Sequence, residues 1–466
     1  MNAKEFLNNV SKEIRYKPAN KYISDELESH IEELKNDNLC KGLSEEQAEE
    51  TAVEQMGDAK KIGKRLNRIH RPKLDWKILI LIMILIVFRV VMSFKSYTDQ
   101  IEFRKMMGWP DDDVSFLITQ IPLIKSLTTG IILGAIVYFF DYRKTKKWAN
   151  IFYLLGTLVI FFQWFDQFAF DKFINNILGD PHGMAWFVNM RLWNISIPLY
   201  IIAFAGYMAD YKKEDFWDMV ILYTISCLLI YLKSQSITNT VILVVSYLAI
   251  LAAKMLQNNK NTRKKVIGAC GGVLTISILI MVAMTNVWIP YIFYGPETSE
   301  DTWNNFAKTQ ENQEKILENI KWVGEAGEDA DPHGGTNFRF IYILGKLGII
   351  PAVLLVGTIL LMSIRLIKDS KSINDEYGKY LIIGLSATYI LQSIIQVLMN
   401  INILPTSDIN LPFVSSGKLY FLINSFTFAV ILSVYRRKNI NFEEPKKSKL
   451  DIKIEKIFWE EVNTIE

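Results

Sequence analysis

The feature that most constrains this chain is a series of long apolar runs separated by short charged segments. A helix that crosses a bilayer needs about 20 predominantly apolar residues, because every backbone polar group must be satisfied inside the lipid. Ten runs approach that length, at roughly 77–96, 123–141, 148–165, 191–209, 216–233, 236–255, 265–288, 338–367, 379–401 and 417–435. We therefore expect an all-α, polytopic membrane protein with about ten transmembrane helices.

The overall composition agrees with this class. Half of the 466 residues are hydrophobic and 12% are aromatic, which is too apolar for an ordinary soluble enzyme of this length. The formal net charge of +3 gives no indication of a nucleic-acid partner. Cys40, Cys227 and Cys270 lack the spacing of metal ligands, so the sequence assigns no metal site.

The charged segments between the runs alternate in sign. Lysine and arginine gather in KRLNRIHRPK before the first run, in NNKNTRKK after the sixth and in YRRKN after the tenth, whereas PDDD and GPETSEDTW are acidic. Basic loops stay in the cytoplasm. We therefore predict a multi-pass membrane protein with both termini cytoplasmic. The large loop at about 289–336 and the loop at 404–418 then face outward.

Residues 1–72 form a separate polar segment with helix signals. Ser44 to Gln47 has the pattern of a capping box, and Asp58 follows Gly57 as an expected N-cap. We predict a small cytoplasmic helical bundle, followed by a membrane domain at 73–440 and a cytoplasmic tail at 441–466. The bundle resembles helical prefix modules fused ahead of membrane proteins in Gram-positive bacteria. It has no catalytic constellation, which favours a role in interaction or regulation.

A polar, turn-rich stretch, LPTSDINLPFVSSGK, lies between the last two apolar runs. Two prolines and several hydroxyls favour an irregular backbone, which is tolerated at membrane depth where it lines a cavity. Thr406 and Ser415 can donate hydrogen bonds to phosphate or sugar oxygens, and Lys418 adds a positive charge. A structural turn without a ligand is the alternative interpretation.

This stretch resembles the loop LPTTGIPLPFVSYGG of the SEDS family, the FtsW, RodA and SpoVE group. Gln392 falls where the family has a glutamine, and FFDYRKTKK and ADYKK resemble its cytoplasmic turns. The resemblance covers about residues 75–440. It implies a ten-helix peptidoglycan glycosyltransferase that polymerises lipid II, an undecaprenyl-pyrophosphate-linked disaccharide peptide, at the outer membrane face. It also implies a class B penicillin-binding protein as a partner.

The segment GTNFRFIYILGKLG departs from the family pattern. Asn337 occupies the position of the family's catalytic aspartate, and an amide cannot serve as a general base. Gly345 and Lys346 replace two glutamates of the family, and Arg339 replaces an apolar residue.

Other residues in this region can supply charge. Asp329 and Asp331 lie in WVGEAGEDADPHGG, which either provides a base or a divalent-cation ligand or is a solvated acidic loop. Arg339 and Lys346 are seven residues apart and share a helical face. They either form a cationic groove for a lipid phosphate or extend to the head groups. For Arg89 we expect extension to the head groups or an internal pair.

Three functions therefore remain open: a glycosyltransferase that uses another acid, a scaffold or regulator of a cell-wall synthase, and a lipid-precursor transporter. The sequence identifies no cofactor, and a divalent cation is the cofactor that the acidic loop could bind. The candidate catalytic residues are Asn337, Asp329 and Asp331, and the candidate substrate-binding residues are Thr406, Ser415, Lys418, Gln392, Lys346 and Arg339.

Overall fold

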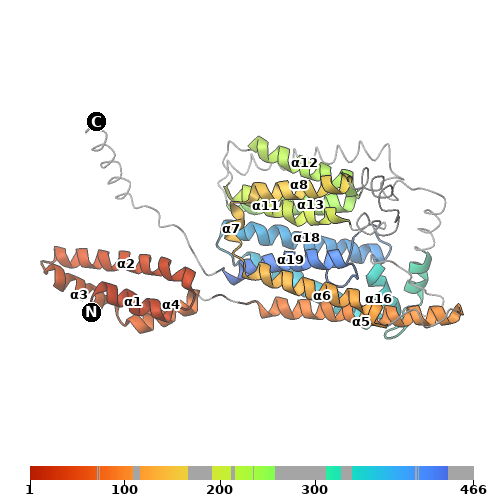
Figure 1. Ribbon diagram of the computed structural model, residues 1–466, viewed down its shortest axis with the longest axis horizontal. Helices are drawn as coiled ribbons and strands as arrows, with labels where there is room; N and C mark the ends of the chain where they lie inside the picture. Colours follow the sequence, from red (N-terminus) through yellow and green to blue (C-terminus); the bar gives the residue numbers. More distant parts are fainter. Residues whose placement is uncertain are drawn as a thin grey trace, which may run out of the picture. The chain divides into compact units, whose positions relative to one another are not determined.

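The computed structural model describes residues 1–70, 72, 74–108, 116–165, 191–210, 216–234, 236–257, 311–326, 338–404, 407 and 409–438. Every regular element in these ranges is a helix, so the all-α prediction is confirmed for the described part of the chain. The chain divides into two compact units, Met1–Lys73 with Arg436–Glu466 and Leu74–Tyr435 (Figure 1).

The first unit contains α1 (Ala3–Glu13), α2 (Lys17–Cys40), α3 (Glu45–Met56) and α4 (Ala59–His70). Its helices surround an apolar core of their own that includes Phe6, Val10, Ile31 and Val53. The capping box at the start of α3 is present as predicted, because the Ser44 side chain accepts from the Gln47 backbone and the Gln47 side chain accepts from the Ser44 backbone. Its cytoplasmic location and its role remain predictions.

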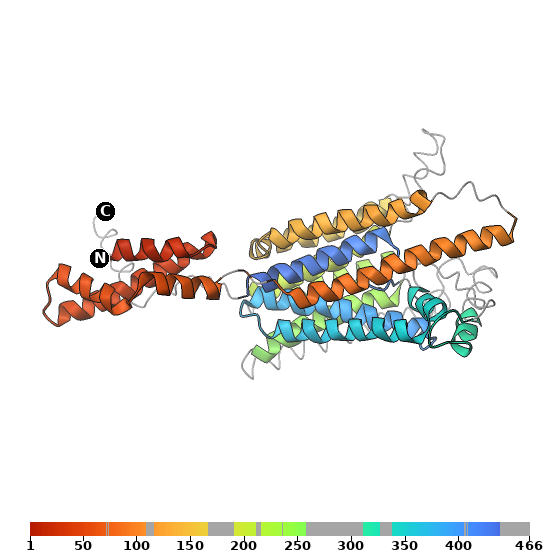
Figure 2. The same cartoon turned by 90° about the horizontal axis from the view of Figure 1, so that it is seen from below.

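The second unit is a bundle of long apolar helices that run alongside one another (Figures 1 and 2). Within the described residues, seven helices are long and apolar enough to cross a membrane. The elements of this unit are α5 (Trp76–Met106), α6 (Phe116–Phe139), α7 (Arg143–Lys146), α8 (Ala149–Phe165), a 3-10 turn (Leu192–Ile195), α11 (Ser196–Asp210), α12 (Phe216–Ser234), α13 (Ile237–Gln257), α16 (Arg339–Leu347), α17 (Ile349–Ser370), α18 (Glu376–Asn400) and α19 (Lys418–Arg436).

Nine of the ten predicted apolar runs coincide with a helix in the described part of the chain. The remaining run, 265–288, lies outside the described residues, so the count of ten stays a prediction.

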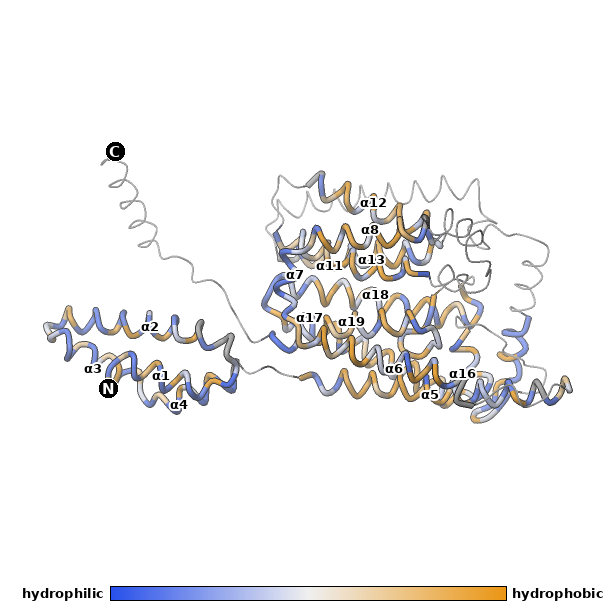
Figure 3. The backbone as a smooth tube through the Cα atoms, viewed as in Figure 1, coloured by the Kyte–Doolittle hydropathy of each residue, from blue (hydrophilic) through white to orange (hydrophobic). Residues whose placement is uncertain are grey.

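Burial distinguishes central from peripheral helices. In the most apolar stretch of α11, 72% of the residues are buried, against 11% in that of α6. Close packing at the centre depends on small residues. A Cβ at Gly384 of α18 would lie 2.6 Å from Ile250 Cδ1, so the glycine lets α13 approach. Apolar side chains such as Ile131 of α6 and Ile364 of α17 are exposed, as expected for helices in contact with lipid. Hydrophobic residues predominate along the long helices of this unit (Figure 3).

The predicted eighth span, 338–367, is wrong as a single helix. The chain forms the short α16, turns at Gly348 with φ of 95°, and begins the spanning helix α17 at Ile349. The cause is a backbone clasp in which residues 321–326 pair with residues 345–350. Its hydrogen bonds run from Gly324 N to Leu347 O (3.0 Å), Ala326 N to Gly345 O (2.8 Å), Ile349 N to Lys321 O (3.0 Å) and Ile350 N to Trp322 O (3.1 Å).

Candidate functional site

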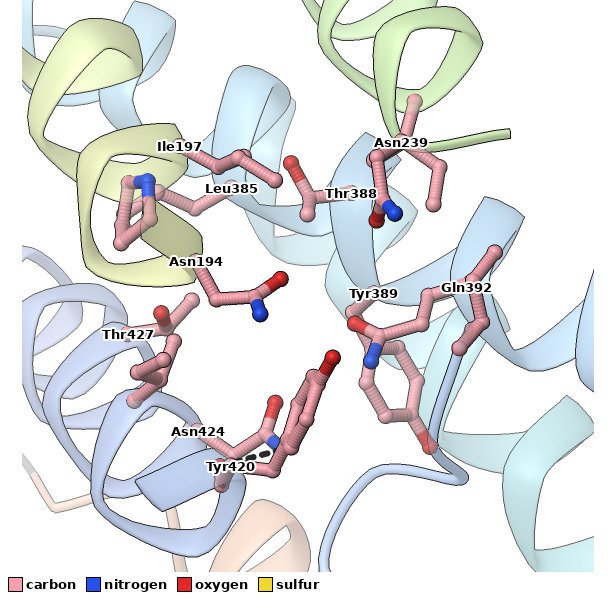
Figure 4. A pocket seen from close by; sticks show the side chains of 14 residues that line it. Asn194, Ile197, Asn239, Leu385, Thr388, Tyr389, Gln392, Tyr420, Asn424 and Thr427 are labelled. Carbon is pink, nitrogen blue, oxygen red and sulfur yellow. Dashed lines mark hydrogen bonds between the residues drawn. The ribbon is translucent and has the colours of Figure 1, made fainter. Parts of the chain in front are cut away.

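A polar pocket lies among α11, α13, α18 and α19, within the apolar bundle (Figure 4). We call it the amide pocket. Its volume is about 40 Å³, enough for a few water molecules or for the polar edge of a larger ligand. None of its lining residues carries a formal charge. They are Asn194, Ile197, Pro198, Asn239, Ile242, Leu385, Thr388, Tyr389, Gln392, Ile409, Tyr420, Ile423, Asn424 and Thr427.

Several polar side chains of the pocket already donate to backbone carbonyls. The amide nitrogen of Asn194 donates to Arg191 O (3.0 Å), and that of Asn424 donates to Tyr420 O (2.8 Å). The hydroxyl of Thr388 donates to Gly384 O (3.1 Å). These bonds fix the side chains, so the geometry of the pocket is set before any ligand enters.

Asn239 differs from these side chains. It is only 3% exposed, and its amide nitrogen has no hydrogen-bond partner in the described structure. A buried donor without a partner costs about 1–3 kcal/mol of desolvation. A ligand oxygen in the pocket would recover that cost.

The loop before α19 is held by amides of α18. Gln392 Nε2 donates to Asn410 O (2.8 Å) and Gln396 Nε2 donates to Ile409 O (3.2 Å). Gln392, a predicted substrate-binding residue, thus lines the pocket and also supports the loop. Ser415 is buried, and its hydroxyl accepts from Leu411 N (2.9 Å), so the structure places it inside the turn. Lys418 is exposed and begins α19.

Arg89 is buried rather than extended to the membrane surface. Its guanidinium donates to Ser415 O, to Ser416 O (3.2 Å) and to Ser126 Oγ (3.1 Å). Its Cζ also lies 4.8 Å from the centre of the Phe421 ring. The expected internal partner is therefore present, but it consists of carbonyls, a hydroxyl and a ring instead of an acid.

Arg339, in the first turn of α16, donates to Ser416 Oγ (2.7 Å), and its Cζ lies 5.4 Å from the Tyr342 ring centre. Burial lowers the pKa of Arg339, whose guanidinium nonetheless stays charged. The helix itself is anchored to α18, because Ile341 N donates to Asn400 Oδ1 (3.0 Å).

Lys346 belongs to an acid–lysine cluster of Lys95, Asp99, Glu325 and Lys346. Lys346 Nζ lies 3.6 Å from Asp99 and 3.5 Å from Glu325, and Lys95 Nζ lies 3.3 Å and 2.5 Å from the same acids. The hydrogen bond from Lys95 lowers the pKa of Glu325. Burial, together with the hydrogen bond that Tyr342 donates to Asp99 (2.7 Å), raises the pKa of Tyr342. The charge of Lys346 is thus compensated by acids.

Four predicted site residues, Asn337, Asp329, Asp331 and Thr406, lie outside the described residues. No group of three or more histidines, cysteines or acids in the described ranges can hold a metal ion.

Sequence reasoning missed Asn239 and Asn424. The available signal was a polar residue inside an apolar run, which commonly faces the bundle interior.

The C-terminal part of the chain matches a known family. Residues 331–440 match the sequence model of the FtsW/RodA/SpoVE family, described as cell cycle protein. The chain is 33% identical over 112 residues to a probable peptidoglycan glycosyltransferase FtsW of Coxiella burnetii, covering 23% of this chain and 30% of that protein. It is 27% identical over 107 residues to the protein of that name from Enterococcus hirae, covering 23% and 27%. The alignments thus span under a third of these relatives' length.

The fold of the membrane unit agrees with a solved structure of a cell-wall synthase. A chain from "Structural coordination of polymerization and crosslinking by a peptidoglycan synthase complex" superposes with a TM-score of 0.55 and 16% identity, over 80% of this chain and 99% of that chain. Rod shape determining protein RodA of Thermus thermophilus gives a TM-score of 0.48 and 13% identity, over 78% and 98%. The chain thus carries a C-terminal segment similar to the FtsW/RodA/SpoVE cell cycle proteins, and its fold is similar to that of a chain of a peptidoglycan synthase complex.

Proposed function

We propose that this protein acts in cell-wall synthesis on lipid II, the lipid-linked peptidoglycan precursor, at the outer face of the bacterial membrane, and polymerises its glycan. The observation that carries the proposal is the amide pocket, which lies beside the loop shared with the family and is lined by uncharged hydrogen-bonding side chains. Curated relatives named probable peptidoglycan glycosyltransferases support the same activity.

The chemistry of the pocket suits a sugar rather than an ion. Amides and hydroxyls offer both donors and acceptors, which match the hydroxyls of a saccharide, and Tyr389 and Tyr420 add aromatic surface. No lining residue offers a charge for a pyrophosphate. Asn239 has an unused donor for a sugar oxygen.

Polymerisation requires that a sugar hydroxyl lose a proton and that a pyrophosphate leave. Asn337 cannot accept that proton, so we assign the role of base to Asp329 or Asp331 in the acidic loop. If a divalent cation takes part, the same loop would hold it. Replacing each aspartate in turn by asparagine separates the two: the base is the position at which polymer formation stops while precursor binding persists.

We further propose a class B penicillin-binding protein as the membrane partner, with both termini of this chain in the cytoplasm. The superposed chain comes from a peptidoglycan synthase complex that coordinates polymerisation with crosslinking, which supports a partner that crosslinks. The first unit would then face the cytoplasm, as an interaction or regulatory module.

The test is a reconstituted assay with the full chain in liposomes and fluorescent lipid II, with products resolved by length. We expect glycan chains from the wild type and none from Asn239→Leu. As a matched control, Thr358→Val changes a buried side chain of α17 whose hydrogen bond within the described residues goes to Leu354 O of the same helix. This variant should retain activity. Precursor binding without polymer would favour a scaffold, and absence of binding would contradict the proposal.

A further inference from the structure

Two arginines from distant parts of the chain meet at a single serine. Arg89 of α5 donates to Ser416 O (3.2 Å), and Arg339 of α16 donates to Ser416 Oγ (2.7 Å). Ser416 is exposed, whereas Arg89 is only 3% exposed. The serine therefore forms an open edge of a site whose positive charges lie beneath it.

Neither guanidinium has an acidic partner among the described residues. The acid–lysine cluster on the same two helices provides the contrast, because there two lysines meet two carboxylates. Unlike Lys95 and Lys346, Arg89 and Arg339 thus carry charges that no described carboxylate compensates. Burying an unpaired charge is unfavourable, so the arrangement calls for an anion.

The arginines also retain unused donors. The Nε atom of Arg89 and the Nε atom of Arg339 are both buried and without a hydrogen-bond partner in the described part of the chain. A guanidinium presents its N–H groups as a planar fork that matches two oxygens of a phosphate group. The free donors and the free charge therefore point to the same chemical class of ligand.

We propose that Arg89 and Arg339 form an anion site at Ser416 that binds the phosphate group of a lipid. Phe421, which lies against Arg89, directly follows Tyr420, a lining residue of the amide pocket, so one turn of α19 carries contacts to both. The proposal rests on the function above: the amide pocket receives the sugar, and the arginine site receives the phosphate to which that sugar is linked.

The phosphate can come from the polyprenyl precursor or from a membrane phospholipid, and a binding experiment distinguishes the two. The full chain, in nanodiscs of phosphatidylcholine, is titrated with undecaprenyl pyrophosphate, with undecaprenol and with phosphatidylglycerol. We expect tight binding of undecaprenyl pyrophosphate only. Arg339→Gln should weaken it roughly 10- to 100-fold, the equivalent of one lost charge-assisted hydrogen-bonding group. Arg89→Lys keeps the charge but loses the fork, and should weaken it about 10-fold.

Lys368→Gln is the matched control, because it removes one exposed positive charge from the end of α17 remote from α16 and should leave binding unchanged. Equal, arginine-dependent binding of phosphatidylglycerol would support the site and identify a membrane phospholipid as its occupant. Variants that unfold at the wild-type temperature but bind undecaprenyl pyrophosphate at wild-type strength would overturn the proposal, leaving the arginines as supports of the turn at Ser415 and Ser416.

The same proteins, assayed for glycan chains, separate this inference from the proposed function. If binding depends on the arginines but the wild type forms no polymer, the proposed polymerase activity is overturned and the anion site stands. Polymer formation by the wild type, together with binding that does not depend on the arginines, would overturn the anion site and leave the proposed polymerase intact.

Discussion

Replacing Gly348 by alanine should release the backbone clasp that positions α16. The residue has φ of 95° and ψ of −173°, a conformation reserved for glycine, and a side chain there costs about 1–3 kcal/mol. The new Cβ would lie 2.8 Å from Lys321 O and 2.9 Å from both Trp322 O and Val323 Cα. These are backbone atoms that cannot rotate away, so overpacking adds about 1–3 kcal/mol. The clasp should thus weaken by about 2–6 kcal/mol.

Hydrogen exchange of the purified full-length protein measures this effect locally. A loss of even about 2 kcal/mol raises the population of the open clasp roughly 30-fold, and exchange of the amides that donate within it, at Gly324, Ala326, Ile349 and Ile350, should accelerate accordingly. Gly357→Ala is the control, because that glycine lies within α17 with open space around its Cβ position, and it should leave exchange unchanged or slightly slower. Wild-type exchange in the Gly348→Ala protein would refute the role assigned to the clasp.

Three further predictions concern Asn337, the turn before α19 and the clasp. If Asn337 occupies the position of the catalytic acid, as the resemblance to the SEDS family implies, Asn337→Asp restores a carboxylate there and should raise the rate of glycan formation. An unchanged rate would argue against that alignment. Ser415→Ala removes the acceptor for Leu411 N and should lower the free energy of unfolding by about 1–3 kcal/mol, seen as a lower melting temperature, with equal melting counting against the turn's contribution. Because the hydrogen bond from Lys95 lowers the pKa of Glu325, the stabilisation that this carboxylate provides is present above the ordinary carboxyl pKa and is lost as pH falls through the lowered value. Hydrogen exchange of residues 321–326, corrected for intrinsic rates, should therefore accelerate as pH falls below the ordinary carboxyl pKa. A pH-independent result would exclude this contribution.

The positions of the helices could be predicted because the length of an apolar run is a local property. Most described spans begin and end close to their runs, although α5 continues to Met106, ten residues past its run. The capping box at Ser44 formed as its spacing indicated. The break between α16 and α17 could not be predicted in this way. The run is apolar on both sides of Gly348, and the break depends on hydrogen bonds to residues 321–326, which no periodicity reveals.

The site residues show the same limit. The acids that compensate Lys346 come from α5 and from the loop at 321–326, so its sequence neighbourhood alone suggested a free cation. Arg89 was expected at the surface or in a pair, and only the fold brings it to Ser416 alongside Arg339. Asn239 lies in the pocket because α13 and α18 pack closely at Gly384, a contact between distant segments.

The central claim is that the amide pocket receives the sugar of a lipid-linked precursor, and site-specific photocrosslinking tests it most directly. A diazirine amino acid at Ile423 of α19 lines the pocket, whereas the same probe at Ile364 of α17 is exposed on the apolar outer face. With lipid II labelled on its sugar, the account predicts crosslinks from position 423 that unlabelled lipid II competes away, and none from position 364. Equal crosslinking at the two positions, or none at position 423, would contradict it.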